Sequence, residues 1–250
     1  MNTLRRLRLP ALLALDLLLL VALAAVVWAD NAANRGIAFT AAPEPLPARP
    51  EIGVNLFNLH LEPDPAAVTR TLDLAAAMGA RYARMQVPWD DIEIHGRGDF
   101  EDRRNLDTVG AVSAWAKYDR IAAAANAAGV ELIWRLERPP AWARARADAT
   151  PEFQAGLLED GNSTGPPDDY ADYGAFVAAV VERYDGDGVD DAPGSPVVRH
   201  FQLWNEPNLK NEWGWAEPRP EEFVELLRVG AEAARAASPE VVILFPGLAP

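Results

Sequence analysis

A short run near the end of the chain, Trp204-Asn205-Glu206-Pro207, contains residue types that can carry out acid–base chemistry. The apolar residues before it predict a buried strand, and Glu206 falls where that strand should end. Proline donates no ladder hydrogen bond and biases the preceding residue toward extended backbone, so Pro207 is expected to break the strand. The carboxyl group of Glu206 should then project from the edge of the sheet, where it can exchange a proton with a ligand.

Aromatic and amide side chains surround Glu206 in the sequence. Trp204 precedes it, Trp213 and Trp215 follow it, and Asn205 offers both a hydrogen-bond donor and an acceptor. Tryptophan rings provide flat apolar faces of the kind that stack on sugars, and an amide pairs well with hydroxyl groups. The pattern indicates cleavage of glycosidic bonds.

The composition is compatible with a neutral ligand. Half of the 250 residues are hydrophobic, enough for one substantial core or two small ones. The net charge of −14 would repel phosphate backbones, so nucleic acid is not expected as a partner. The chain has no cysteine, which excludes disulfides and thiolate metal sites. The acidic run 185–191 lacks the ligands of an EF-hand and is interpreted as a solvated turn, so neither a metal nor a cofactor is expected.

The N-terminal residues 1–29 are typical of an export signal. Three arginines precede an apolar stretch at residues 9–28 that is interrupted only by Asp16. A cleaved signal peptide is favoured, because an uncleaved membrane anchor would place Asp16 in the bilayer at a cost of about 2.5–3.5 kcal/mol. Both alternatives place the rest of the chain outside the cytoplasm, secreted or membrane-anchored.

A linker and one domain follow this segment. Residues 30–50 are rich in alanine and proline and predict an extended linker, so the domain should cover residues 51–250. Apolar runs of strand length alternate there with longer helical patterns, which indicates βα units around a parallel sheet. The expected strands are 52–57, 81–89, 131–136, 197–204 and 241–245. The expected helices are 64–78, 114–128, 170–184 and 220–237.

Two polar segments after strands, 95–109 and 144–168, are unusually long. Loops after strands gather at one rim of a parallel barrel, so their length favours a built-up cleft. Ordinary insertions are the alternative, because long loops rich in Asp, Arg and Gly need not carry function.

The run around Glu206 resembles the acid/base motif of clan A retaining glycoside hydrolases, which include cellulases and β-xylosidases. Arg84 on the second expected strand resembles that clan's arginine near the nucleophile, and Pro139-Pro140-Ala141-Trp142 resembles its Pro-Pro-x-Trp segment. The resemblance covers about residues 51–250 and implies a (β/α)8 TIM barrel that acts on oligo- or polysaccharides.

The same resemblance implies roles for individual residues. Glu206 would be the general acid/base, Asn205 would bind the sugar hydroxyl next to the reacting carbon, and Arg84 would orient the nucleophile. Trp142 and Trp213 would contact the substrate. His60, after the first strand, is a further candidate for sugar contact, with an ordinary loop histidine as the alternative.

The barrel is expected to be incomplete, because only about five of eight βα units are present. In the clan the nucleophile is a second glutamate at the end of the seventh strand, which would lie beyond residue 250. A retaining mechanism needs two carboxyl groups about 5–5.5 Å apart, so this chain alone is expected to be inactive.

Other carboxylates could substitute for that nucleophile. Glu137, Asp90 and Asp91 should lie on the same rim, although pairing with arginine is the more ordinary role there. The second hypothesis for the whole chain is a noncatalytic carbohydrate-binding or scaffold protein built on a partial barrel.

Overall fold

The computed structural model describes residues 3–33, 51–160 and 164–250. These residues divide into two compact units, Met1–Pro50 and Glu51–Pro250. The second unit begins where the sequence predicts the domain to begin, and it contains every residue proposed above for chemistry.

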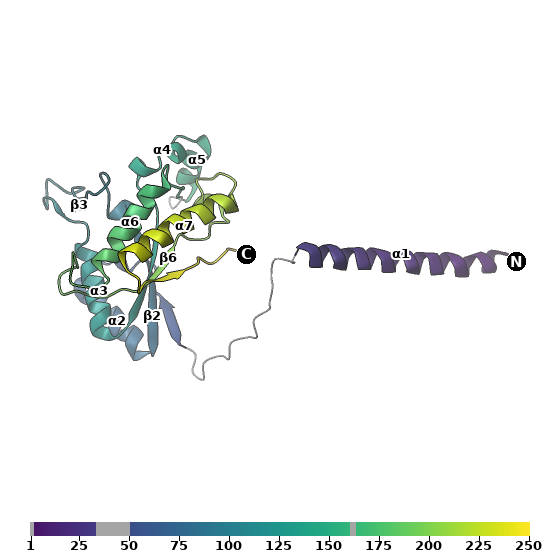
Figure 1. Cartoon of the computed structure of the whole chain (residues 1–250), viewed down its shortest axis with the longest axis horizontal. Coiled ribbons are helices and arrows are strands. Elements are labelled where there is room, and N and C mark those ends of the chain that lie inside the picture. Colours follow the sequence, from purple (N-terminus) through teal and green to yellow (C-terminus); the bar gives the residue numbers. More distant parts are fainter. Residues whose placement is uncertain (1–2, 34–50, 161–163) are drawn as a thin grey trace. The chain divides into compact units, whose positions relative to one another are not determined.

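The first unit contains one long helix, α1 (Thr3–Ala33) (Figure 1). Its apolar side chains between residues 13 and 28 are exposed. The helix continues through residues 30–33, where the linker was expected to begin, and the rest of that linker lies outside the described residues. Among the residues described, no helix combines the length and apolarity that crossing a bilayer requires. An export signal stays a prediction.

The second unit is built on a sheet of five parallel strands, which confirms all five expected strands with somewhat different ends. The strand order, β1-β2-β5-β6-β7, follows the chain without reversal. The strands are β1 (Ile52–Asn55), β2 (Ala80–Pro88), β5 (Glu131–Glu137), β6 (His200–Leu203) and β7 (Val242–Leu244).

The four expected helices are also present, and their ends follow local chemistry. They are α2 (Pro65–Ala77), α3 (Ala116–Ala128), α6 (Tyr170–Arg183) and α7 (Pro220–Ala237). The side chains of Asp64 and Asp169 accept hydrogen bonds from backbone N–H groups in the first turns of α2 and α6, as N-caps do. Gly129 ends α3 in a left-handed conformation with φ of 71°, which glycine adopts without strain.

The strand order places these helices on one face of the sheet. Right-handed crossovers between consecutive parallel strands always return on the same side, so an order without reversal leaves the opposite face uncovered. Figure 1 shows α2, α3, α6 and α7 on one side of the strands. This is the arrangement of a partial (β/α) barrel with about five units.

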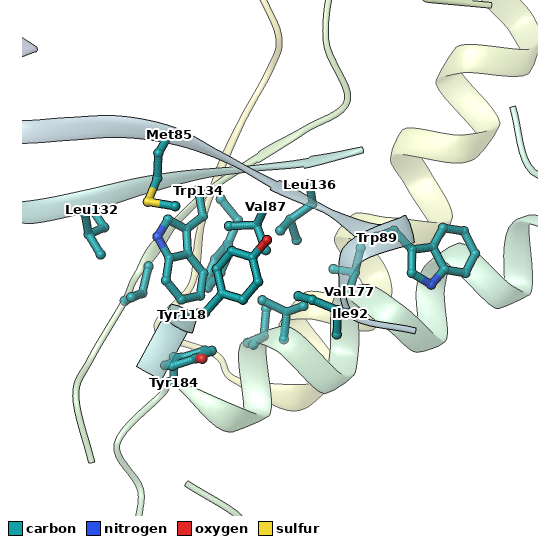
Figure 2. Packing of buried hydrophobic residues seen from close by; sticks show 14 of the residues in the cluster. Met85, Val87, Trp89, Ile92, Tyr118, Leu132, Trp134, Leu136, Val177 and Tyr184 are labelled. Carbon is teal, nitrogen blue, oxygen red and sulfur yellow. The ribbon is translucent and has the colours of Figure 1, made fainter. Parts of the chain in front are cut away.

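The helix-covered face carries the hydrophobic core. Trp134 of β5 is fully buried and packs edge-to-face against Tyr184 and Tyr118, with ring centroids 4.5 and 6.2 Å away. Figure 2 shows these rings together with Met85 and Val87 of β2. Trp115 is also buried and belongs to the same core.

The opposite face of the sheet is polar. Gln86, Arg135 and Gln202 are register partners on the adjacent strands β2, β5 and β6, so they form one row across the sheet. Strand side chains alternate between faces, which puts this row opposite Met85, Trp134 and Phe201. A row of polar side chains would be costly against helices, and here it faces the uncovered side.

The two long loops contain short elements that the sequence did not predict. β3 (Glu101–Asp102) lies in the first loop and forms a small hairpin with β4 (Val112–Ser113), which follows this loop. The second loop holds α4 (Ala145–Asp148) and α5 (Pro151–Asp160). Short 3-10 turns follow strands or begin loops at η1 (Leu59–Leu61), η2 (Trp89–Asp91), η3 (Ala141–Ala143) and η4 (Lys210–Glu212).

Replacing Trp134 with alanine is expected to destabilise the domain by about 3–5 kcal/mol, because the surrounding aromatic rings cannot close the cavity. Urea unfolding of the full chain followed by circular dichroism measures this loss. The exposed Val109→Ala variant is the control and should stay within about 0.5 kcal/mol of the wild type. A loss of less than about 1 kcal/mol for Trp134→Ala would contradict this core arrangement.

Candidate active site

A polar cleft of about 930 Å³ lies on the uncovered face of the sheet, at the carboxyl ends of the strands. Both long loops contribute to its wall, through Arg104 from the first and Thr164 from the second. This agrees with the prediction that the loops build up a cleft. Seven of the candidate residues line it: His60, Arg84, Asp90, Asp91, Glu137, Asn205 and Glu206.

A sharp break after β6 carries Glu206 into this cleft. The strand ends at Leu203, and Trp204 and Glu206 have positive φ values of 70° and 31°. The expectation that Pro207 breaks the strand was therefore wrong in position, because the left-handed Trp204 already ends it. Glu206 also lacks the extended backbone that a following proline favours. Left-handed backbone is costly for non-glycine residues and concentrates at functional sites.

Hydrogen bonds fix the side chains beside Glu206. Arg84 donates from Nε to Gln202 Oε1 at 2.8 Å and from Nη2 to Asn205 Oδ1 at 3.3 Å. Asn205 Nδ2 lies 3.4 Å from Glu206 Oε2. Among the described residues, neither Arg84 nor Glu206 forms an ion pair. The Glu206 carboxyl group and the Arg84 guanidinium therefore line the cleft without a direct ion pair, although the negative charges of Glu137 and Glu206 act on Arg84.

Below the rim, Arg135 and Glu137 form a buried ion pair. Their side chains are only 5% and 3% exposed, and Glu137 Oε2 has no hydrogen-bond partner. Burial is the largest influence and raises the pKa of Glu137 to about 7, although the Arg135 guanidinium lowers it. Desolvation prevails because only one carboxylate oxygen is satisfied.

His60 is a buried, neutral member of the cleft wall. Burial, helped by the positive charge of Lys117, lowers its pKa to about 4. Arg135 donates to Gln86 Oε1 at 2.7 Å, which turns Gln86 Nε2 toward His60 Nε2 at 3.4 Å. Because the amide nitrogen can only donate, the histidine proton belongs on Nδ1, and that atom is buried without a partner.

The structure does not place the predicted tryptophans in the cleft. Trp213 is 1% exposed and packs edge-to-face against Trp204, which is also buried, so neither presents a ring face there. Trp142 donates from Nε1 to Glu93 O at 2.7 Å and packs against Trp89, outside the cleft lining. The sequence predicted that the tryptophan rings near Glu206 would stack on a ligand. These rings are instead buried, because large aromatic side chains contribute strongly to hydrophobic cores.

Sequence reasoning missed Glu212, which lines the cleft and accepts a hydrogen bond from Asn205 Nδ2 at 2.6 Å. Burial raises the pKa of Glu212 above its ordinary value. Its place in a polar loop gave no periodic signal. The polar row of Gln86, Arg135 and Gln202 was also missed, although its alternation with apolar residues along the strands could have revealed it.

The remaining candidates have ordinary partners. Asp90 pairs with Arg138 at 3.5 Å, and Asp91 pairs with Arg104 at 2.8 Å and with Lys117. Pairing with basic residues is what the sequence favoured for the two aspartates.

One acidic cluster has a geometry that could hold a cation. The carboxylate oxygens of Asp185, Asp187 and Asp191 lie within 4.8 Å of one another. Asp191 accepts from the backbone of Gly186 and Gly188, at 3.1 and 2.9 Å. Asp185 and Asp187 accept in the same way from the backbone N–H groups of Asp187 and Val189, at 3.1 and 2.8 Å. Each of the three carboxylates thus has a backbone partner within the turn.

Solved structures with a similar fold are glycoside hydrolases. A family 39 enzyme from the gut symbiont Bacteroides cellulosilyticus matches 79% of this chain and 32% of its own, at 18% identity and a TM-score of 0.52. The exo-β-1,4-mannosidase Op5Man5 from an Opitutaceae bacterium matches 78% of this chain and 31% of its own, at 19% identity and a TM-score of 0.52. An endo-β-1,4-mannanase from Thermotoga petrophila matches 78% and 42%, at 15% identity and a TM-score of 0.51.

These matches establish the fold. No family model matches the sequence. The chain spans about a third of the length of the first structures it resembles, and its five βα units correspond to part of a TIM-barrel glycoside hydrolase. The expected fold, an incomplete (β/α)8 barrel, is confirmed.

The raised pKa of Glu137 predicts how stability depends on pH. A carboxyl group whose folded pKa lies above its unfolded value stabilises the fold below about pH 4.5, and this contribution is lost as the pH rises through about 7. Relative to Glu137→Gln, the wild type should therefore lose on the order of 2 kcal/mol between pH 5 and pH 8.

Thermal unfolding of both proteins across this range measures the difference, with the exposed Glu217→Gln variant as control. A wild type that gains stability over Glu137→Gln as the pH rises would show that the Arg135 charge outweighs burial.

Proposed function

We propose that this chain provides the acid/base half of an active site that hydrolyses O-glycosidic bonds in oligo- or polysaccharides. The observation that carries the proposal is the placement of Glu206. Its carboxyl group stands without an ion pair among the described residues, at the mouth of a cleft of about 930 Å³, beside an amide held by Arg84. A carboxyl group at that position can donate a proton to a bridging oxygen.

The polarity of the cleft supports a hydroxyl-rich ligand. Four buried side-chain atoms of its wall have no hydrogen-bond partner: His60 Nδ1, Arg135 Nε, Glu137 Oε2 and Thr164 Oγ1. Unsatisfied buried groups are costly, so several of them in one cleft favour a ligand or ordered water that completes their bonds. A saccharide carries donors and acceptors in one molecule and suits this mixture.

The proposed chemistry is a retaining double displacement. Glu206 protonates the leaving oxygen while a second carboxylate, about 5–5.5 Å away, attacks the anomeric carbon; Glu206 then takes a proton from the water that releases the sugar. We assign that second carboxylate to residues outside this chain, because Asp90, Asp91 and Glu137 are engaged in ion pairs and Glu212 is hydrogen-bonded to Asn205. The mannosidase and mannanase with the same fold suggest a β-linked hexose as substrate.

A noncatalytic carbohydrate-binding protein is the second candidate. It is favoured by the same ion pairs, since they leave the cleft without an obvious nucleophile. The two candidates differ in whether a bound glycoside is cleaved when an external nucleophile is supplied.

For the location of the protein, we propose export through the N-terminal segment. The basic residues before the apolar stretch at 9–28 support this, and a polysaccharide substrate outside the cytoplasm would be consistent with it. Fractionation of cells that express the full chain, with N-terminal sequencing of the product, tests the proposal.

An external nucleophile tests the role of Glu206 directly. With azide in place of the second carboxylate, the full chain should convert aryl β-mannosides to glycosyl azides of inverted configuration. Dinitrophenol leaves without protonation, whereas phenol needs the proton of Glu206. Glu206→Gln should therefore lose about 10²–10⁴-fold of the azide-dependent rate on the phenyl glycoside and little on the dinitrophenyl glycoside.

The release of aryl alcohol is followed by absorbance, and the Glu217→Gln variant serves as control. Equal losses on both substrates would exclude the acid role. Saturable binding of manno-oligosaccharides without any azide-dependent cleavage would instead favour the noncatalytic candidate.

A further inference from the structure

The amide of Asn205 is held at both ends by charged side chains. Its Oδ1 accepts a hydrogen bond from Arg84 Nη2 at 3.3 Å, and its Nδ2 donates to Glu212 Oε1 at 2.6 Å. A guanidinium can only donate, and a carboxylate can only accept. Turning the amide over would therefore bring donor against donor at one end and acceptor against acceptor at the other.

The anchor on the Arg84 side is itself fixed. Arg84 Nε donates to Gln202 Oε1 at 2.8 Å, and Gln202 Nε2 donates to the backbone oxygen of Trp204 at 2.7 Å. The chain of hydrogen bonds therefore starts on β2, crosses to β6 and ends on the left-handed residue that breaks this strand. Each donor in it has a defined acceptor, which leaves the Asn205 amide one orientation on this side.

The anchor on the Glu212 side comes from the loop after β6. The backbone oxygen of Glu212 accepts from Trp204 Nε1 at 3.2 Å, so a fully buried indole fixes the loop. The Glu212 side chain forms no ion pair among the described residues. The charged groups that influence it are Arg135, Arg138, Glu137 and Glu206. Either protonation state of Glu212 keeps an oxygen that can accept from Asn205.

This arrangement leaves one N–H of Asn205 available beside Glu206. The 3.4 Å distance from Asn205 Nδ2 to Glu206 Oε2 is long for a hydrogen bond, so a closer acceptor would displace it. The side of the amide next to the proposed acid thus presents a donor, and a ligand must offer an oxygen there.

We propose that Glu212 is a positioning residue that fixes the Asn205 amide with its N–H toward the ligand, so that a bound sugar must place an oxygen atom beside this N–H. The choice of sugar depends on the proposed function above. The orientation of the amide does not, because it follows from hydrogen bonds within the protein.

The NMR chemical shifts of the Asn205 side-chain amide protons test the orientation without any substrate. In the ¹⁵N-labelled full chain, its two amide protons are assigned with the Asn205→Asp variant. One proton should be shifted downfield by the short bond to Glu212, and Glu212→Ala should abolish this shift. Glu212→Gln should retain it, because the glutamine carbonyl still accepts. Glu217→Gln, an exposed change in the same loop, should have no effect.

Equilibrium binding tests whether the protein requires a ligand oxygen beside the Asn205 N–H. A β-mannotriose should bind the wild type roughly tenfold more tightly than its 2-deoxy analogue, which corresponds to one hydrogen bond. Glu212→Ala should bring this ratio close to one, and Glu212→Gln should preserve it.

Three results would overturn the proposal. The downfield shift of the Asn205 amide proton could be unchanged in Glu212→Ala, or it could be lost equally in the alanine and glutamine variants. The ratio of the affinities for the two sugars could also be unchanged in Glu212→Ala. Loss of azide-dependent cleavage in Glu212→Gln with an intact Asn205 signal would also overturn it, because Glu212 would then act on the reacting atoms. If neither sugar binds the wild type while the signal behaves as expected, the proposed function fails and the assigned orientation of the amide stands.

Discussion

The order of the parallel strands is the constraint on which this structure depends. Because right-handed crossovers return on the same side and the order β1-β2-β5-β6-β7 never reverses, the connecting helices α2, α3, α6 and α7 pack on one face. The helices require apolar partners, and Met85, Trp134 and Phe201 supply them. The other face is released from this requirement, and the residues that alternate with the core positions are free to be polar. The strand order thus leaves an open sheet face on which the cleft can form.

Burying polar groups on the inner face of a sheet costs free energy. Some of these groups have a counterion that offsets the cost, and others do not. Arg135 has a counterion in Glu137, and the aspartates of the rim have counterions in arginine and lysine. Arg84, Glu206 and Glu212 form no such pairs among the described residues, yet Arg84 and Glu212 are tied to one amide. Neutral hydrogen-bond partners orient a charge without cancelling it. Within the described part of the chain, Arg84, Glu206 and Glu212 therefore line the cleft as ionisable groups without a direct ion pair, where a ligand would bind.

The sequence predicted the elements of this fold better than the details of its site. The strands and helices were found because runs of apolar residues, the Asp-Pro start at Asp64 and the stop at Gly129 are local signals. Glu206, Asn205 and Arg84 were found because a resemblance to a known motif points to single residues. Glu212 was missed because its hydrogen bond depends on how a loop folds back. The tryptophans were misplaced for the same reason, since sequence spacing cannot tell which face of a turn is buried.

The backbone break after β6 explains why these local and nonlocal features meet at one place. A regular strand would send Asn205 and Glu206 to opposite faces of the sheet. The left-handed Trp204 changes the direction of the chain, and its cost is offset by burial of the indole and by its hydrogen bond to the Glu212 backbone. The same bond brings Glu212 back to Asn205. One strained residue thus places the carboxyl group at the cleft and fixes the loop that orients its neighbour, so the two functions cannot be separated by changing Trp204.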